Sequence, residues 1–225
     1  MTIGIVIQAR MGSTRLPGKV LRDIGGRPLL AHVVERLGRL RHEVRVVVAT
    51  STKVQDDDIA SWCRCRGVEC FRGSEGDVLD RYWRCTEQCG FEHVVRLTAD
   101  NPFTDIEELD RLLALHLSGH YDYSHSFGQM PLGVGAEVFS REALAKSHAQ
   151  GHKPNHREHV NEYIEEVPED FRIARLVVPA AKVAPLLRLT VDTLEDWQRA
   201  CRLVGARPDC QLETEEAIRL CSRFA

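Results

Sequence analysis

The sequence contains no apolar stretch long enough to cross a bilayer as a helix. Its first residues also lack the basic segment and the long apolar run of a secretory signal. Neither sign of charge dominates, because 30 lysines and arginines face 33 aspartates and glutamates, which gives a net charge of −3. These absences argue against a membrane-embedded chain, a nucleic-acid coat and a polybasic membrane binder. We therefore expect a cytoplasmic protein whose partners include neither nucleic acid nor membrane.

The cysteine spacing of a zinc ribbon is missing as well. The chain has eight cysteines, but Cys63, Cys65 and Cys70 do not form paired C-x-x-C motifs, and neither do Cys85 and Cys89. In a chain without an export signal we interpret these residues as reduced thiols. No linker rich in glycine, proline or serine interrupts the 225 residues. That length suits one large domain, so we expect a single domain over 1–225.

The first half contains a regular alternation of strand and helix patterns. Short β-branched and apolar runs predict strands, and apolar residues at helical spacing predict helices between them. The predicted strands are 3–7, 44–48, 68–71 and 94–97, and the predicted helices lie around 30–40, Trp62, 78–83 and 106–113. A capping box of Thr104 and Glu107 would open the last helix. The alternation predicts a doubly wound α/β fold with a mostly parallel central sheet.

The second half is less regular, and we expect it to contribute a smaller insertion. Strands are predicted at 133–139 and 173–178, and a helix is predicted at 159–166. Thr193 and Asp196 are expected to begin a further helix.

One short segment occurs twice. Arg96-Leu97-Thr98-Ala99-Asp100 is echoed by Arg188-Leu189-Thr190-Val191-Asp192. Each copy ends a predicted strand with an aspartate, at the edge where open α/β sheets bind ligands. Taken alone, Asp100 and Asp192 each suit a helix N-cap better than a metal ligand. A five-residue echo also arises by chance and does not establish a duplication.

The most informative segment is the loop 8–19, which follows the first predicted strand. It carries the cations Arg10, Arg15 and Lys19 among glycines and hydroxyl side chains. Glycine lets backbone N–H groups approach an anion closely, and arginine and lysine neutralise phosphate charge. The combination suits a triphosphate. The plainer alternative is a basic surface loop with solvated arginines.

Spacing excludes two familiar phosphate-binding loops. A P-loop has four residues between its glycines and Ser or Thr after its lysine. Here five residues separate Gly12 from Gly18, and Val20 follows Lys19. The dinucleotide fingerprint also fails, because Gly12 has no glycine two residues away.

Together with later segments, this loop resembles the bacterial cytidylyltransferases that activate acidic sugars, the family of CMP-3-deoxy-manno-octulosonate and CMP-sialate synthetases. Within that family, the chain is most similar to the branch named for a spore-coat polysaccharide biosynthesis protein. The shared stretches follow in order along most of the chain: 7–19, 25–29, 48–50, 73–82, 99–102, 157–160 and 191–193. The resemblance implies a fold like that of the nucleotide-diphospho-sugar transferases.

The resemblance also implies a reaction: transfer of CMP from CTP to an anionic small-molecule acceptor, with Mg²⁺ as cofactor. Asp100 and Asp192 match the positions that hold the metal, and Lys19, Arg15 and Asp100 match catalytic positions. The implied nucleotide contacts are Ala9, Arg10, Gly12, Ser13, Thr50, Ser74, Arg81 and Thr98. The implied acceptor contacts are Arg157, His159 and Glu137. Related enzymes pair through the second half, so a homodimer is expected, with dimerisation and acceptor binding at about 120–180.

Some of these residues have plainer interpretations. Arg81 could pair with Asp77 or Asp80 on a helix surface. Arg157 and His159 could belong to a helix surface at a subunit contact. In the spore-coat branch an aspartate usually stands where this chain has Gly135, so the identity of the acceptor is open.

Four histidines form a further cluster in the sequence: His148, His152, His156 and His159. Their spacing would suit a metal site only on a continuous helix, and Gly151 and Pro154 interrupt it. We do not expect a metal there.

Two other functions are compatible with these patterns. One is a glycosyltransferase that uses a nucleotide-sugar donor on a similar fold, although such a donor has no terminal phosphates for three cations. The other is a non-catalytic nucleotide-binding protein.

Overall fold

A seven-stranded sheet forms the centre of the computed structural model, which describes residues 2–206 and 212–224. The strand order is β5-β4-β1-β6-β8-β7-β9. The strands are β1 Ile3–Gln8, β4 Arg45–Ser51, β5 Glu69–Gly73, β6 His93–Thr98, β7 Tyr123–His125, β8 Glu137–Ser140 and β9 Ile173–Arg175. A separate two-stranded ribbon consists of β2 Asp23–Ile24 and β3 Arg27–Pro28.

The sheet is mostly parallel. β1 pairs in parallel with β4 and β6, and β4 pairs in parallel with β5. Among the described strands only β8 runs against its neighbours β6 and β7. The chain moves outward from β1 through β4 to β5, then returns to the other side of β1 as β6. This reversal creates a crevice beyond the carboxyl ends of β1 and β6, and the prediction of a doubly wound fold is confirmed.

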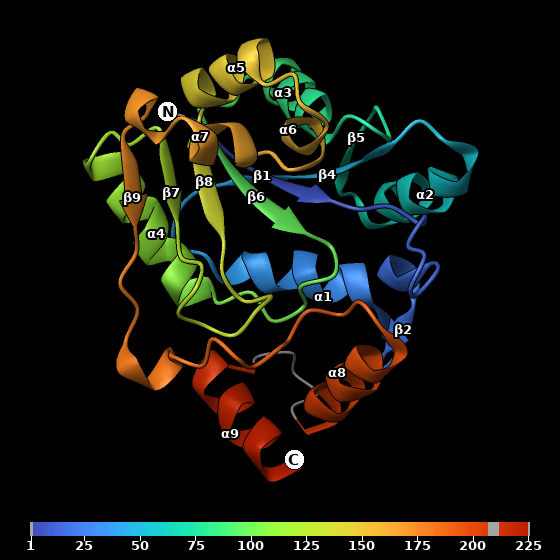
Figure 1. The fold of residues 1–225 in the computed structure, drawn as a ribbon. Helices are drawn as coiled ribbons and strands as arrows, with labels where there is room; N and C mark the ends of the chain where they lie inside the picture. Colours follow the sequence, from blue (N-terminus) through green and yellow to red (C-terminus); the bar gives the residue numbers. More distant parts are fainter. Residues whose placement is uncertain (1, 207–211, 225) are drawn as a thin grey trace.

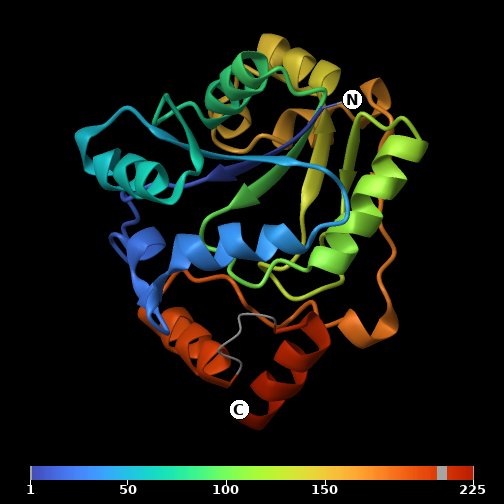
Figure 2. The same ribbon diagram turned by 180° about the vertical axis from the view of Figure 1, so that it is seen from behind.

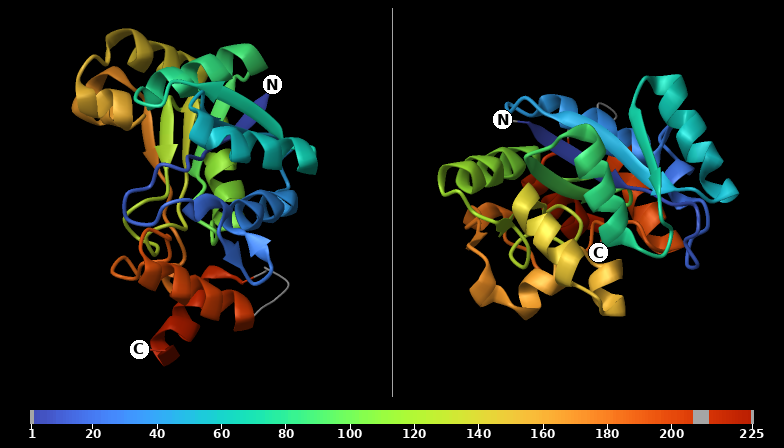
Figure 3. Two further views of the ribbon diagram at one scale, coloured as in Figure 1. Left: turned by 90° about the vertical axis from the view of Figure 1, so that its right-hand side faces the viewer. Right: turned by 90° about the horizontal axis from the view of Figure 1, so that it is seen from above.

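Helices cover both faces of the sheet, as Figures 1 and 2 show. Apolar side chains of α1, α2, α4 and α8 pack with the sheet in one buried cluster, and those of α3, α5 and α7 pack in a second. In the left view of Figure 3, α8 and α9 form a further layer beyond α1. The helices are α1 Leu29–Arg36, α2 Asp57–Arg66, α3 Val78–Cys89, α4 Ile106–Ser118, α5 Arg141–Gln150, α6 Pro154–Glu158, α7 Glu162–Glu166, α8 Leu194–Ala206 and α9 Thr214–Phe224.

Several predicted element boundaries are wrong, each for a local reason. The strand predicted at 133–139 is only β8, because Gly133 has φ +98° and the chain turns there. The helix predicted at 159–166 is interrupted, since His159 has extended backbone between α6 and α7. The strand predicted at 173–178 stops at Arg175, where its partner β7 also ends.

The expected capping box of α4 is displaced by one residue. Asp105, rather than Thr104, is the N-cap, and its side chain accepts a hydrogen bond from the Glu108 N–H at 3.0 Å. Thr104 instead donates its hydroxyl to the Asn101 carbonyl.

Two further findings concern the absences noted above. Within residues 2–206 and 212–224, no helix is both long enough and apolar enough to cross a membrane. The seven described cysteines are free thiols, and Cys210 lies outside the described residues.

Candidate active site

The glycine loop folds back on itself immediately after β1. The Met11 carbonyl accepts hydrogen bonds from Ser13 N–H and Gly18 N–H, and the Met11 N–H donates to the Asp56 carboxylate at 2.7 Å. Gly18 has φ +67°, a conformation that favours glycine, and it precedes the short helical turn that carries Lys19. The turn therefore directs Lys19 back toward the carboxyl ends of β1 and β6.

Lys19 lies between the two aspartates of the sequence echo. Its ammonium is 2.7 Å from Asp100 Oδ2, 2.7 Å from Asp192 Oδ1 and 2.9 Å from the Val191 carbonyl. The Lys19 residue is only 7% exposed. The structure thus brings together three residues that are far apart in sequence.

Neither aspartate caps a helix, so the plainer interpretation of both is wrong. Asp100 follows β6, and its other carboxylate oxygen accepts from the Thr98 hydroxyl. Thr193, rather than Asp192, provides the cap of α8, because its hydroxyl accepts from the Asp196 N–H at 3.2 Å. Both carboxylates are free to face a shared site.

A network of charges surrounds Asp192. Arg15 lies 3.0 Å from Asp192 Oδ1, and Arg188 donates to Asp192 Oδ2. Burial acts to raise the pKa of Asp192, but the hydrogen bond and charge of Lys19, with the charges of Arg15 and Arg188, hold it below the ordinary value. Asp192 is therefore a carboxylate at neutral pH.

A cavity of about 250 Å³ opens over this cluster. It lies at the reversal point of the strand order, where β1 and β6 end. The lining is strongly polar and consists of Gln8, Arg10, Gly12, Ser13, Thr14, Arg15, Lys19, Val20, Thr98, Ala99, Asp100 and Asp192. The loop cations Arg10, Arg15 and Lys19 therefore share with Asp100 and Asp192 a single space large enough for part of a nucleotide.

A family model described as Cytidylyltransferase matches residues 4–223 of the sequence. The chain belongs to the cytidylyltransferase family. The spore coat polysaccharide biosynthesis protein SpsF of Bacillus subtilis (strain 168) is 39% identical over 226 residues, which cover 97% of this chain and 93% of that protein. A 3-deoxy-manno-octulosonate cytidylyltransferase of Geobacter sulfurreducens is 38% identical over 116 residues, 51% of this chain and 45% of that one.

The fold of this cytidylyltransferase also matches a solved relative. A cytidylyltransferase from Leptospira borgpetersenii superposes with a TM-score of 0.92 at 31% identity, over 100% of this chain and 95% of that chain. The resemblance inferred from the motifs is confirmed, and so is the fold class.

Cytidylyltransferases of this type usually use a divalent metal, and the donor set here fits one. The carboxylates of Asp100 and Asp192 and the Val191 carbonyl already converge on one cation, the Lys19 ammonium. All three are oxygen donors, which Mg²⁺ prefers. These residues could hold a divalent cation if the Lys19 ammonium shared or left that position.

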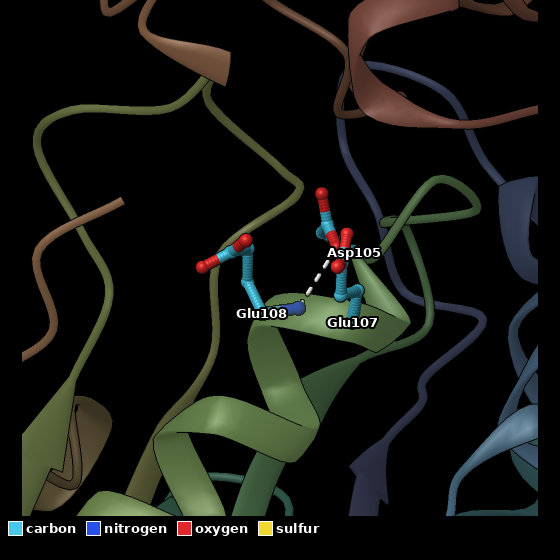
Figure 4. A group of neighbouring side chains, drawn as sticks. All are labelled: Asp105, Glu107 and Glu108. Atoms are coloured by element: carbon cyan, nitrogen blue, oxygen red, sulfur yellow. Dashed lines mark hydrogen bonds between the residues drawn. The ribbon is translucent and has the colours of Figure 1, made fainter. Parts of the chain in front are cut away.

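The cytidylyltransferase has a second acidic group, which sequence reasoning did not identify. Asp105, Glu107 and Glu108 gather at the start of α4, as Figure 4 shows. The Lys182 ammonium lies 3.1, 2.7 and 3.0 Å from their carboxylates, respectively. Arg111 also pairs with Glu108, and the Thr214 hydroxyl donates to Asp105. Internal cations already neutralise this group, so it is a poor metal site.

Four residues expected to contact the nucleotide lie outside the cavity lining. Thr50 in β4 is fully buried, and its hydroxyl has no hydrogen-bond partner within the described residues. Ser74 borders a different concavity beside β5. Arg81 is buried in α3, where burial lowers its pKa and its guanidinium donates to the Ser74 carbonyl. The alternative of a surface pair with Asp77 or Asp80 is therefore wrong. Ala9 is buried at the start of the loop, where its N–H donates to Ala49.

The residues expected to contact the acceptor do not gather in one place. Glu137 is 0% exposed, and its oxygens accept from Arg96 and from the Tyr123 hydroxyl, the latter at 2.6 Å. This carboxylate is closed off from solvent in the structure, and its assignment to acceptor binding stays a prediction. Arg157 lies 3.5 Å from the Asp77 carboxylate, and His159 is exposed between α6 and α7.

The four histidines do not form a metal site. His148 lies 3.0 Å from an Asp80 oxygen, and His156 lies 2.7 Å from a Glu166 oxygen. His152 and His159 are exposed. Across the described ranges, the acidic group at the start of α4 is the one close set of three or more potential ligands.

Sequence reasoning missed the residues that position Asp192. The Asp196 carboxylate accepts from the N–H groups of Asp192 and Thr193 at 3.1 and 3.0 Å. Arg188 contacts both Asp192 and Asp196. The repeated segment includes Arg188, at the position that corresponds to Arg96, so the sequence did draw attention to this residue. Its contacts with Asp192 and Asp196 depend on the tertiary structure and could not be predicted.

Proposed function

We propose that this cytidylyltransferase transfers CMP from CTP to a hydroxyl of a sugar acid, releasing pyrophosphate, in the synthesis of a surface polysaccharide or glycoconjugate. The convergence of Lys19, Asp100 and Asp192 beneath a cationic loop carries the proposal. A triphosphate has enough negative charge to use Arg10, Arg15 and Lys19 together. Similarity to SpsF and to 3-deoxy-manno-octulosonate cytidylyltransferase supports the polysaccharide and sugar-acid assignments.

The proposed reaction is an in-line displacement. The acceptor oxygen forms a bond to the α-phosphorus, and the bond from that phosphorus to the α–β bridging oxygen breaks. The acceptor hydroxyl gives its proton to solvent water, and the electron pair of the broken phosphorus–oxygen bond leaves with pyrophosphate. Arg15 and Lys19 would neutralise the charge that develops on the leaving group. Arg10, Gly12, Ser13 and Thr98 line the same cavity and would orient the phosphates, with Ala9 supporting the loop.

Asp100 and Asp192 would hold Mg²⁺ in this scheme. When bound, the cation neutralises phosphate charge and polarises the reacting phosphoryl group. Thr98 and Arg188 fix the outward oxygens of the two carboxylates, so that each keeps one oxygen toward Lys19.

The other assignments are also proposals. Thr50, Ser74 and Arg81 would serve the cytidine side of the site. Within the described residues, Arg81 Nε and Nη2 and the Thr50 hydroxyl have no partner, so they retain hydrogen-bonding capacity. Arg157 and His159 would serve the acceptor or a subunit contact. We further propose a homodimer in the cytoplasm that pairs through residues of about 120–180.

A pyrophosphate-release screen tests the proposal directly. Four nucleotides are each combined with sugar acids and phosphorylated acceptors, with and without Mg²⁺. We expect release with CTP, a sugar acid and the metal. Consumption of a nucleotide-sugar donor without pyrophosphate would favour the glycosyltransferase. Binding of CTP by calorimetry without turnover of any acceptor would favour a nucleotide-binding protein.

A further inference from the structure

Two cysteines lie on either side of the turn that joins α2 to β5. α2 ends at Gly67, which has φ +66°, and the Val68 N–H donates to the Cys63 carbonyl at 2.9 Å. This form of helix end turns the chain back across the last turn of the helix. Cys63 in α2 and Cys70 in β5 are therefore brought close to each other by local geometry.

The alternation of side chains along β5 places Cys70 on the side of the sheet that α2 covers. Its neighbour Phe71 packs on the opposite side, in the buried cluster of α3, α5 and α7. Cys63 and Val68 pack in the other cluster, to which α2 contributes. The Cys63 thiol donates a hydrogen bond to the Cys70 sulfur. The two sulfur atoms therefore lie within hydrogen-bonding distance of each other.

The two thiols differ in solvent access and in proton affinity. Cys70 is exposed on β5, at one edge of the sheet, whereas Cys63 is 0% exposed. The hydrogen bond from Cys63 and the charge of Arg72 lower the pKa of Cys70 against the effect of burial. The same hydrogen bond and burial raise the pKa of Cys63. Because the thiolate is the reactive form, Cys70 is the nucleophile of the pair and Cys63 keeps its proton.

A second pair of thiols lacks this asymmetry. Cys85 and Cys89 lie one turn apart in α3, and their side chains are also hydrogen-bonded to each other. Cys85 is 0% exposed, and burial raises the pKa of both thiols. The thiolate form of either residue is therefore scarce at neutral pH. Contact between two thiols does not by itself make a reactive pair, which makes Cys85 and Cys89 an internal control.

We propose that Cys63 and Cys70 form a reversible disulfide when the protein meets a peroxide. The Cys70 thiolate attacks a peroxide oxygen, the O–O bond breaks, and Cys70 becomes a sulfenic acid. The released hydroxide takes a proton from solvent. The Cys63 sulfur then bonds to the Cys70 sulfur, the S–O bond breaks, and the hydroxyl leaves as water with the Cys63 proton. Two thiols are thereby oxidised by two electrons, and one peroxide is reduced to two waters.

The pair is connected to the nucleotide cavity through α2. Asp56, directly before α2, accepts a hydrogen bond at 2.7 Å from the N–H of Met11 in the glycine loop. Asp57, the first residue of α2, pairs with Arg72 of β5 at 2.7 Å. A disulfide bond holds two sulfur atoms closer together than a hydrogen bond between thiols does, so α2 and β5 must shift when it forms. We expect this shift to weaken the hydrogen bond from Met11 and with it the binding of CTP.

The first measurement requires no nucleotide. The full-length protein is treated with an equimolar amount of hydrogen peroxide, its remaining thiols are alkylated, and the digest is analysed by mass spectrometry. We expect a peptide pair joined through Cys63 and Cys70, which dithiothreitol separates again. Cys85 and Cys89 should be recovered in alkylated form.

Variants then assign the roles of the two sulfur atoms. Cys63→Ser should leave Cys70 as a sulfenic acid, which dimedone labels, because no thiol remains to displace its hydroxyl. Cys70→Ser should give neither the disulfide nor the label, and since Cys70 is exposed this variant is expected to fold even if the Cys63 variant does not. Cys65→Ser removes another exposed thiol of α2 and is the matched control, in which the disulfide should form as in the wild type.

Calorimetry measures the effect on the glycine loop, a step that rests on the proposed function. The oxidised wild type should bind CTP about tenfold more weakly than the reduced protein, the loss expected from one hydrogen bond to a charged group. Cys70→Ser should bind CTP equally well before and after the same treatment.

The outcomes separate the inference from the proposed function. Absence of a disulfide between Cys63 and Cys70, or equally fast joining of Cys85 and Cys89, overturns the inference. A disulfide with unchanged CTP binding overturns the connection to the glycine loop. If the reduced protein binds no CTP, the proposed function fails, whereas the mass spectrum still decides whether the disulfide forms.

Discussion

Two lysines of this enzyme are nearly buried, and each contacts carboxylates that are far from it in the sequence. Lys19, 7% exposed, lies between Asp100 and Asp192. Lys182, 4% exposed, lies among Asp105, Glu107 and Glu108. In residue types the two clusters are almost the same.

Their surroundings differ. The Lys19 cluster faces a cavity lined by Arg10, Arg15 and Gly12. Lys182 instead joins α4 to the segment before α8, where the Thr214 hydroxyl donates to Asp105. Although burial acts to lower the pKa of Lys182, its hydrogen bonds to Glu107 and Glu108 raise it. A buried lysine among acids is thus no sign of function by itself. The Lys19 cluster differs from the Lys182 cluster because it opens into a cavity that further cations line.

The largest effect expected from this comparison is on stability at Lys182. Lys182→Ala leaves the buried Asp105 without its cation and Glu108 with Arg111 alone, which should lower the free energy of unfolding by about 3–5 kcal/mol. Urea unfolding measures the loss, and the folded fraction should keep its kcat. Lys146→Ala, which breaks an exposed pair with Asp170, serves as control and should cost about 1 kcal/mol or less. If Lys182→Ala is stable but inactive, the Lys182 cluster is needed for catalysis rather than for stability, and this prediction is wrong.

Lys19→Ala should show the opposite pattern. We expect turnover to fall at least about a hundredfold, the loss typical of removing one transition-state stabiliser, with a much smaller change in unfolding free energy. Steady-state pyrophosphate release provides the measurement, and exposed Lys53→Ala is the control. Undiminished activity would remove Lys19 from the mechanism.

A third buried titratable group sharpens the comparison, because its hydrogen-bond partners are not carboxylates. His116 contacts His93 and Ser124, and burial, with the charge of His93, lowers its pKa from 6.5 to about 4. As pH falls, His116 is therefore protonated in the unfolded chain at a higher pH than in the folded protein. Relative to His116→Asn, the wild type should lose stability below pH 6.5 and stop losing it near pH 4, by up to about 3 kcal/mol. If the unfolding free energies of the wild type and of His116→Asn change equally with pH across this range, the prediction is wrong.

The smallest expected effect concerns the metal. Asp100→Asn and Asp192→Asn should each raise the Mg²⁺ concentration needed for half-maximal rate by roughly tenfold or more, since even outer-shell changes shift metal affinity tenfold. Glu107→Asn alters an acid of the other cluster and should leave the metal titration unchanged. If all three variants need the same Mg²⁺ concentration for half-maximal rate, Asp100 and Asp192 do not hold the metal.

The architecture of the first half was predictable because its signals are local. The strand β4, for example, is buried on both faces from Val47 to Ser51, as expected for a strand of a sheet that helices cover on both sides. The echo and the loop 8–19 also indicated which charges converge. The strand predicted before Asp192 is wrong, however: only Asp100 follows a strand, and the segment before Asp192 has a single bridge, from Arg188 to Leu132.

The second half was less predictable because its contacts are long-range. The ion pair of Glu137 with Arg96 spans 41 residues, and Lys182 reaches acids 74 to 77 residues away. No pattern at helical or strand spacing indicates such partners. The turn at Gly133, which shortens β8, likewise brings this residue into close contact with the distant Thr190.

The hydrogen bonds of Lys19 reach 81 residues to Asp100 and 172 residues to Val191. During translation, the nascent chain has all the strands of the β5-β4-β1-β6 half long before the ribosome adds Asp192. A premature stop between the codons for Asp100 and Asp192 would therefore yield a polypeptide with one acid of the pair and no complete phosphate site.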